Sequence, residues 1–230
     1  MGSLASIIGA TDNIKPPAYV PIYEQIFAPL RHQKLKILEL GVFQGGSLKV
    51  WERYFPHAEI AGLDLRLPGM AFDSGRVRMF EGDQSDPGIL DRIAAEVAPD
   101  GFDIVIDDAA HIAALAKASF WHLFEHHLRP GALYCIEDWG TGYWNGWPDG
   151  SKFETFESRT NGVQRRFPSH DFGMVGFVKQ LVDECHYNAI KDTQVLPNNR
   201  PSRFACMSIY AGLVVVTKAA DPDHTGKTGG

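Results

Sequence analysis

Two short apolar runs in this sequence each end in a pair of carboxylates, and an imidazole follows the first pair. Asp107, Asp108 and His111 follow the first run, and Glu137 and Asp138 follow the second. Four carboxylates held close together repel one another unless a cation lies among them. These residue types therefore predict a cation site with an imidazole beside it, provided that the fold brings both runs to one place.

Both runs are predicted to be buried strands of a parallel sheet, at 103–107 and 134–137. Each is a continuous apolar stretch bounded by polar residues, which fits a strand that is covered on both faces. In open α/β sheets, ligands bind outside the carboxyl ends of the strands. Two neighbouring strand ends would therefore place all four acids around one crevice, with the imidazole a few residues beyond.

Composition limits the class of protein. The chain has 230 residues, 44% of them hydrophobic, which is enough for one sizeable core, and we expect a single domain over residues 1–218. The 28 Asp and Glu exceed the 22 Lys and Arg, and no basic run occurs. The electrostatic footprint of a nucleic-acid binder is therefore missing, and a small-molecule or oligosaccharide acceptor is the expected partner.

The cysteines and the chain ends bear on location. The sequence has three cysteines, Cys135, Cys185 and Cys206. An odd number without close spacing favours buried reduced thiols in a cytoplasmic protein. The sequence shows neither a secretory signal nor an apolar run of the ~20 residues that a membrane span needs, so no membrane partner is expected. Residues 219–230 are small and polar and are predicted to be a disordered tail.

The first half of the chain has the order strand, glycine loop, helix. A helix at 19–30 and a strand at 36–40 precede a loop that contains Gly41, Gly45, Gly46 and Ser47 and a helix through Val50, Trp51 and Tyr54. Glycines allow the backbone to approach a ligand closely, and a helix N-terminus adds unpaired N–H donors. The next strand, 59–63, ends at Asp64, about 20 residues past the loop, where an acid binds ribose hydroxyls.

The glycine spacing favours a ligand that has an adenosine but no pyrophosphate. Phe43 stands where the second glycine of a nicotinamide-binding loop admits a pyrophosphate. A third strand, 76–80, leads to Asp83, which could accept a hydrogen bond from an adenine amino group, with Gln84 beside it. Alternatively, Asp83 could cap the next helix, 86–97.

The second half of the chain is predicted to complete the sheet. A helix at 113–128 connects the two acid-bearing strands, and another helix is expected at 174–186. Strands at 203–210 and 213–217 form a closing antiparallel hairpin. Residues 139–171 are rich in Gly, aromatic and polar residues and too long for a simple connection, which is typical of an acceptor-binding lid.

These motifs together resemble the class I S-adenosylmethionine-dependent methyltransferases. The resemblance rests on Glu39-x-Gly41 with Gly45-Gly46-Ser47, and on Asp64, Asp83 and Asp107 at successive strand ends. It implies an α/β fold: a Rossmann-like, doubly wound, mostly parallel seven-stranded sheet with an antiparallel C-terminal hairpin.

A second motif narrows the resemblance. Asp108-x-x-His111 with Glu137-Asp138-Trp139 is similar to the metal-dependent sugar O-methyltransferases of macrolide biosynthesis and of mycobacterial methylmannose polysaccharide synthesis, and to the related cephalosporin-modifying group. The similarity runs from about residue 11 to residue 217. The chain departs from similar proteins at Thr11-Asp12-Asn13 and at Ala18, where they often carry Thr-Asp-Lys and a His.

The resemblance implies a set of site residues. Contacts to S-adenosyl-L-methionine are implied for Glu39, Gly41, Gly45, Ser47, Asp64, Asp83, Gln84 and Asp107. A divalent metal would be held by Asp108, Glu137 and Asp138. Hard oxygen ligands favour Mg²⁺ over zinc, although another divalent cation could use them. The metal would orient two vicinal sugar hydroxyls, and His111 would take the proton of the attacking one. The acceptor side would include Tyr143, Trp144, Trp147 and His170.

Each of these residues also has a structural alternative. The acids after the first strand could cap the next helix, those after the second could lie on a solvated loop, and His111 could cap or pack. The aromatic residues could pack within the lid or against another subunit, and His170-Asp171 could begin a helix. His122 and His126 have the spacing of a helical metal pair, but no third ligand is apparent, which favours a polar helix face.

The sequence therefore predicts an S-adenosylmethionine- and Mg²⁺-dependent enzyme that methylates a sugar hydroxyl. By analogy, the first expected acceptor is a manno-oligosaccharide, and the next is another glycosylated natural product. One alternative is a metal-dependent methyltransferase acting on a catechol or antibiotic intermediate. Another is a cofactor-binding scaffold without catalysis. The aromatic residues and the resemblance also suggest a homodimer.

Overall fold

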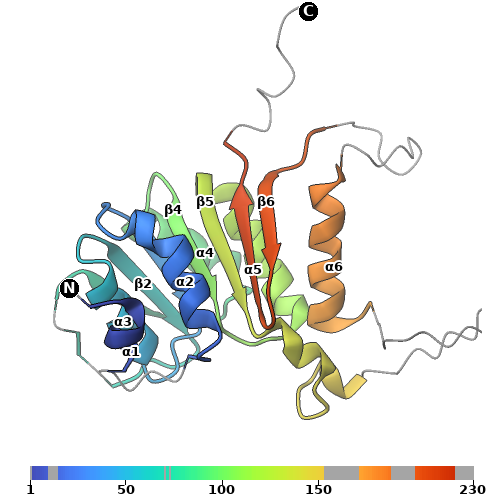
Figure 1. Ribbon diagram of the computed structural model, residues 1–230, viewed down its shortest axis with the longest axis horizontal. Helices are drawn as coiled ribbons and strands as arrows, with labels where there is room; N and C mark the ends of the chain where they lie inside the picture. The colour runs from blue at the N-terminus through green and yellow to red at the C-terminus, as the bar shows by residue number, and fades with distance from the viewer. Residues whose placement is uncertain are drawn as a thin grey trace, which may run out of the picture.

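A seven-stranded sheet forms the centre of the structure, a computed structural model that describes residues 2–9, 15–69, 71–72, 74–152, 171–187 and 200–220 (Figure 1). The strands are β1 (Lys36–Leu40), β2 (Glu59–Asp64), β3 (Val77–Glu81), β4 (Phe102–Asp107), β5 (Leu128–Glu137), β6 (Phe204–Ile209) and β7 (Leu213–Lys218). Their order is β3-β2-β1-β4-β5-β7-β6, parallel except for β7, which runs antiparallel to both β5 and β6. The predicted fold class is confirmed.

Helices cover both faces of the sheet. They are α1 (Leu4–Ile8), α2 (Tyr19–Phe27), α3 (Gly46–Tyr54), α4 (Pro87–Val97), α5 (Ala113–His126) and α6 (Gly173–Cys185), with short 3₁₀ turns η1 (Ala28–Leu30), η2 (Trp139–Tyr143) and η3 (Gly150–Lys152). One apolar core joins α1, α2 and α3 to one face, and another joins α4, α5 and α6 to the other. Adjacent β4 residues belong to different cores, Ile104 to the first and Val105 to the second, because strand side chains alternate.

The strand register brings the chemically interesting residues to one edge. Leu40, the last residue of β1, pairs with Leu63 on one side and with Asp107 on the other. Asp107 in turn pairs with Ile136 of β5. β1 lies between β2 and β4, so the strand order reverses beside the carboxyl end of β1. Ligands bind at this point in open α/β sheets.

An aromatic cluster holds α5 and α6 on the sheet. The fully buried Phe120 ring lies 4.7 Å from the Tyr134 ring centroid, 5.7 Å from Phe177 and 6.0 Å from Phe204. We expect Phe120→Ala to lower the free energy of unfolding by about 3–5 kcal/mol, because the large buried cavity cannot collapse fully. Chemical denaturation measures this. Val182→Ala, on the exposed side of α6, serves as the control, and equal losses for the two variants would contradict the prediction.

Several sequence expectations need correction. The helix predicted at 113–128 ends at His126, because Leu128 already belongs to β5. The third strand covers 77–81 rather than 76–80. The cysteines are free but are not all buried: Cys135 is buried, Cys185 is partly exposed and Cys206 is exposed, since β6 is an edge strand. The short helix α1 was not predicted at all.

The sequence favoured a polar helix face for His122 and His126, and their rings lie 5.2 Å apart on α5. His122 shares a carboxylate with His127 rather than with His126, and that carboxylate belongs to Asp91 of α4. The helix alone could not reveal this contact, because Asp91 lies on a different element. Among the described residues, every helix is too short or too polar to cross a membrane.

Candidate active site

The loop after β1 approaches the end of β4 backbone to backbone. Gly41 has a φ of 82°, and a Cβ at this position would lie 2.2 Å from the Asp108 carbonyl oxygen. The Asp64 carboxylate accepts hydrogen bonds of 2.8 Å from the N–H groups of Val42 and Phe43. Phe43 has a φ of 50° and its side chain is 71% exposed. Asp64 therefore fixes a strained loop that only a glycine at position 41 allows to form.

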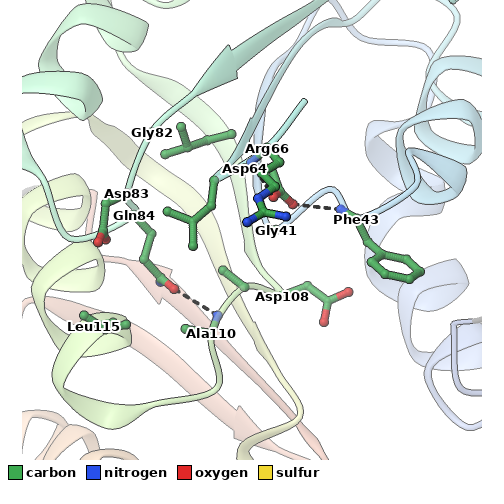
Figure 2. A pocket seen from close by; sticks show the side chains of 13 residues that line it. Gly41, Phe43, Asp64, Arg66, Gly82, Asp83, Gln84, Asp108, Ala110 and Leu115 are labelled. Carbon is green, nitrogen blue, oxygen red and sulfur yellow. Dashed lines mark hydrogen bonds between the residues drawn. The ribbon is translucent and has the colours of Figure 1, made fainter. Parts of the chain in front are cut away.

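A cavity of about 570 Å³ opens beside this loop (Figure 2). Its walls include Gly41 and Asp64 from the first two strands, Asp83 and Gln84 after β3, and Asp108 after β4. Leu65 and Leu115 add apolar surface. Apolar walls with a few convergent polar groups suit a nucleoside-sized ligand.

The two polar residues after β3 have different environments. Asp83 is exposed and accepts hydrogen bonds from the Ser85 N–H and hydroxyl, which lowers the pKa of its carboxyl. It does not cap α4, because Asp86 does so through the Gly88 N–H. Gln84 is buried and accepts from the Ala110 N–H while donating to Asp107 (Figure 2).

Two of the acids for which cofactor contacts were predicted lie beneath the cavity floor. Asp107 is buried and accepts hydrogen bonds from Gln84, Ser119 and Tyr134, and burial raises the pKa of its carboxyl to about 6. Glu39 is fully buried and accepts from the Ser47 hydroxyl at 2.7 Å and the Trp51 indole at 3.1 Å.

A second cavity, of about 450 Å³, adjoins the first. Gly41, Phe43, Asp108 and Ala109 line both cavities, so the touching loops of β1 and β4 form a shared wall. The other side of the second cavity is lined by Lys15, His111, Glu137, Asp138 and Trp147, among others. A ligand in the first cavity would therefore lie next to a ligand in the second.

A lysine of the chain supplies part of the positive charge that these carboxylates require. The ammonium of Lys15 donates to Glu137 Oε1 at 2.6 Å and to Asp108 Oδ2 at 3.0 Å, and lies 3.7 Å from Glu39 Oε1. Burial alone would lower the pKa of Lys15, but the three carboxylates outweigh it and raise that pKa above its usual value. Sequence reasoning missed Lys15, which contacts residues 93 and 122 positions away along the chain.

Two tyrosines of α2 bind the acids at the end of β5. Tyr19 donates its hydroxyl to Asp138 Oδ1 and Tyr23 donates to Glu137 Oε1, both at 2.6 Å. The helical spacing correctly placed α2 beside the sheet, but it treated these side chains as apolar packing only. The signal available in the sequence was the four-residue spacing of two hydroxyl-bearing rings on one helix face.

One oxygen of Glu137 is left unsatisfied. Glu137 Oε2 is buried and has no hydrogen-bond partner in the described part of the chain. Burial raises the pKa of this carboxyl, and the Lys15 ammonium opposes that rise. A buried carboxylate oxygen without a partner is costly unless a ligand completes it. The residue set therefore fits a hard divalent cation bound by oxygen.

His111 lies over the same acids. Its Nε2 atom is 3.8 Å from Asp108 Oδ1 and 3.9 Å from Asp138 Oδ2, and one ligand atom from each of these three residues falls within 4.8 Å of the others. His111 and Asp138 have positive φ angles of 49° and 52°. Strained backbone of this kind gathers at functional sites and must be held by its surroundings.

The proposed helix-capping roles of the first acid pair are wrong. The residue before α5 is Ile112, and the first N–H of that helix is bound by Asp149 Oδ2, which lies in the segment after β5. The same oxygen of Asp149 accepts from the Met174 N–H at the start of α6. Asp149, which the sequence analysis did not single out, thus ties the predicted lid to two helices.

The predicted acceptor-side aromatics differ in position. Trp147 lines the second cavity, and its ring lies 5.2 Å from that of His111. Trp144 is 55% exposed and Tyr143 is 36% exposed, so both stand near the surface of the same segment. His170 lies outside the described residues.

Known proteins resemble the chain over nearly its whole length. The mycinamicin VI 2''-O-methyltransferase of Micromonospora griseorubida is 44% identical over 216 residues, covering 89% of this chain and 49% of the relative. The 8-demethyl-8-(2-methoxy-alpha-L-rhamnosyl)-tetracenomycin-C 3'-O-methyltransferase of Streptomyces olivaceus is 36% identical over 219 residues, covering 90% of this chain and 50% of the relative. The chain thus spans about half the length of the curated relatives it matches. No protein-family model matches it.

A solved structure shows the same fold. MycE methyltransferase from the mycinamycin biosynthetic pathway, in complex with Mg and SAH, aligns with a TM-score of 0.73 and 31% sequence identity. The alignment covers 97% of this chain and 56% of MycE. Sequence and structure comparisons therefore lead to the same group of proteins.

Proposed function

The chain belongs to the metal-dependent sugar O-methyltransferases within the class I methyltransferases, and from this premise we propose that it methylates a sugar hydroxyl of a glycosylated natural product. S-adenosylmethionine is the proposed methyl donor and Mg²⁺ the proposed metal. The observation that carries the proposal is the pair of adjoining cavities, one suited to a nucleoside and the other lined by the carboxylates and His111.

The first cavity would hold the methyl donor. Asp64 stands at the end of β2, where it would bind ribose hydroxyls while keeping the loop after β1 in place. Asp83 offers its carboxylate near the adenine position. Gly41, Gly45 and Ser47 would act through the backbone of the loop. Gln84 would contact the ligand from the cavity wall, and the buried Glu39 and Asp107 would support the site.

The second cavity would hold the metal and the acceptor. Asp108, Glu137 and Asp138 would bind the cation, which supplies Lewis acidity that lowers the pKa of a bound sugar hydroxyl. His111 would accept the proton of that hydroxyl at Nε2 as the oxygen attacks the methyl carbon, in line with its bond to sulfur. Trp147 would offer a flat face to the sugar ring, with Tyr143 and Trp144 proposed from the same segment. His170, outside the described residues, stays a predicted acceptor contact.

The relatives indicate only the chemical class of the acceptor. One of those reported above is named for a rhamnosyl-tetracenomycin and the other for mycinamicin VI, which supports a glycosylated natural product as the acceptor. The manno-oligosaccharide remains a prediction, as do the homodimer and the cytoplasmic location. A catechol would also bind a metal through two oxygens, so it belongs in the same test.

Labelled S-adenosylmethionine tests the proposal directly. The protein is incubated with a rhamnosylated polyketide, a manno-oligosaccharide and a catechol, each with Mg²⁺ and each with EDTA. We expect label on the glycosylated polyketide with Mg²⁺, loss of labelling in EDTA and recovery when Mg²⁺ is restored, because the carboxylates supply a divalent site. Labelling that persists in EDTA would contradict the metal assignment, and labelling of the catechol alone would contradict the sugar assignment.

A further inference from the structure

Three hydrogen-bond donors at four-residue intervals contact the proposed metal-binding carboxylates from one side. We call Lys15, Tyr19 and Tyr23 the donor row. Tyr19 and Tyr23 lie on one face of α2, which runs along the sheet (Figure 1), and Lys15 precedes that helix. Between them they bind Asp108, Glu137 and Asp138, the residues that follow or end β4 and β5.

The donor row binds one oxygen of each carboxylate. Asp108 uses Oδ2, Glu137 uses Oε1 and Asp138 uses Oδ1. The opposite oxygens have different surroundings: Asp108 Oδ1 and Asp138 Oδ2 are the atoms 3.8 and 3.9 Å from His111 Nε2, and Glu137 Oε2 is the buried atom without a partner among the described residues. Each acid thus has one oxygen bound by the donor row and one that the donor row does not bind.

We propose that the donor row selects which oxygen of each carboxylate is available to the metal, so that Tyr19 and Tyr23 are positioning residues for metal binding. This inference rests on the proposed function. Donors that hold the ligands of a metal fix their orientation, and losing such a partner weakens metal affinity without touching the metal itself. The two tyrosines are the cleanest members to test, because removing a hydroxyl changes neither the charge nor the packing of the ring.

The experiment titrates Mn²⁺, as a spectroscopic stand-in for Mg²⁺, into the full chain by calorimetry and electron paramagnetic resonance. Tyr19→Phe and Tyr23→Phe are compared with Tyr54→Phe, a buried tyrosine whose hydroxyl donates to Glu24 of α2 instead of to the site. We expect each test variant to bind Mn²⁺ about 10–100-fold more weakly than wild type, with the affinity for S-adenosylhomocysteine unchanged. Tyr54→Phe should leave both affinities unchanged.

The outcomes separate this inference from the proposed function. If wild type binds Mn²⁺ and the two test variants bind it equally well, the positioning role is overturned while the metal site stands. If the test variants lose affinity for S-adenosylhomocysteine to the same extent as for Mn²⁺, the role is structural and the inference is overturned. If wild type binds no Mn²⁺, both the metal assignment and the inference fall.

A separate group of metal-ligand side chains lies on the surface of α4 and α5. His122 Nε2 and His127 Nε2 both lie 2.7 Å from Asp91 Oδ1, and the three atoms fall within 4.8 Å of one another. Both imidazoles are held in place: their rings lie 5.3 Å apart, and the His127 backbone is fixed by hydrogen bonds to Leu123 and Phe102. Their side chains are about four-fifths buried, whereas that of Asp91 is 57% exposed.

We infer that Asp91, His122 and His127 bind a transition metal such as Zn²⁺ or Co²⁺, independently of the proposed active site. Imidazole nitrogens suit these metals and do not suit Mg²⁺. Neutral imidazoles can direct the Nε2 lone pair toward the shared point, and the exposed Asp91 can move outward to make room for bonds of about 2.1 Å. A bound ion would cross-link α4 to α5.

Calorimetric titration of Co²⁺ in excess Mg²⁺ tests this second site. We expect His122→Gln and His127→Gln to lose one bound equivalent, and His126→Gln to retain it, since His126 packs beside His122 without joining the three ligands. Co²⁺ should also raise the melting temperature of wild type but not of the two loss variants. Equal stoichiometry in wild type, His122→Gln and His127→Gln would overturn the inference.

Discussion

Replacing Asp108 with asparagine is expected to lower the rate of methyl transfer by about 10³-fold, because a metal contributes several kcal/mol of charge stabilisation and each 1.4 kcal/mol is about tenfold in rate. The substitution preserves the side-chain shape and an oxygen that can accept from Lys15. It removes the negative charge at the wall shared by the two cavities. Initial rates at saturating S-adenosylmethionine and increasing Mg²⁺ measure the loss.

Asp100→Asn provides the matched control. The Asp100 side chain is 87% exposed and precedes β4, at the opposite end of the strand from Asp108. We expect the control to keep the wild-type rate and the Asp108→Asn protein to keep the wild-type melting temperature. A rate for Asp108→Asn that matches the control would show that Asp108 does not bind the metal.

His111→Asn is expected to reduce kcat by about 10²–10⁴-fold, the contribution of a well-placed general base. Asparagine is chosen because it tolerates the positive φ that His111 adopts, so the backbone can stay as it is. The residual rate should rise with pH as hydroxide replaces the lost base. Affinity for S-adenosylhomocysteine should not change, because His111 lines the second cavity.

The control for this variant is His57→Asn, an exposed histidine before β2. It should have the wild-type kcat and pH profile. A His111→Asn protein with the wild-type kcat would remove the histidine base from the mechanism, and the proton would then have to leave through the carboxylates or solvent.

Local sequence patterns were sufficient for the sheet and for much of the site. The apolar runs within β2, β4 and β5 are short, buried and followed at once by acidic residues, and the run within β1 is followed by a glycine, so their ends were visible in the sequence. Because parallel strands end at the same edge, that pattern alone brought Asp64, Asp108 and Glu137 into neighbouring positions.

The site residues that the sequence analysis did not find are defined by contacts between segments that are distant along the chain. Lys15 sits between Ile14 and two prolines, a setting with no periodicity to indicate burial. Its partners lie in β1, just after β4 and in β5. Asp149 is one acid in a polar segment, and only the arrangement of α5 and α6 shows that it binds both. The Asp91 carboxylate was invisible for the same reason, since it reaches His122 from another helix.

The close approach of Gly41 to the Asp108 carbonyl limits which substitutions can reshape the two cavities of this protein. Gly41 lines both cavities and leaves no room for a Cβ, so a substitution at this position would require the backbone to move. Trp147 and its segment after β5, by contrast, line the second cavity and not the first. Under the proposed function, exchanging that segment would change the acceptor side and leave the methyl-donor side as it is, so the segment is the place to graft or randomise in a search for new acceptors.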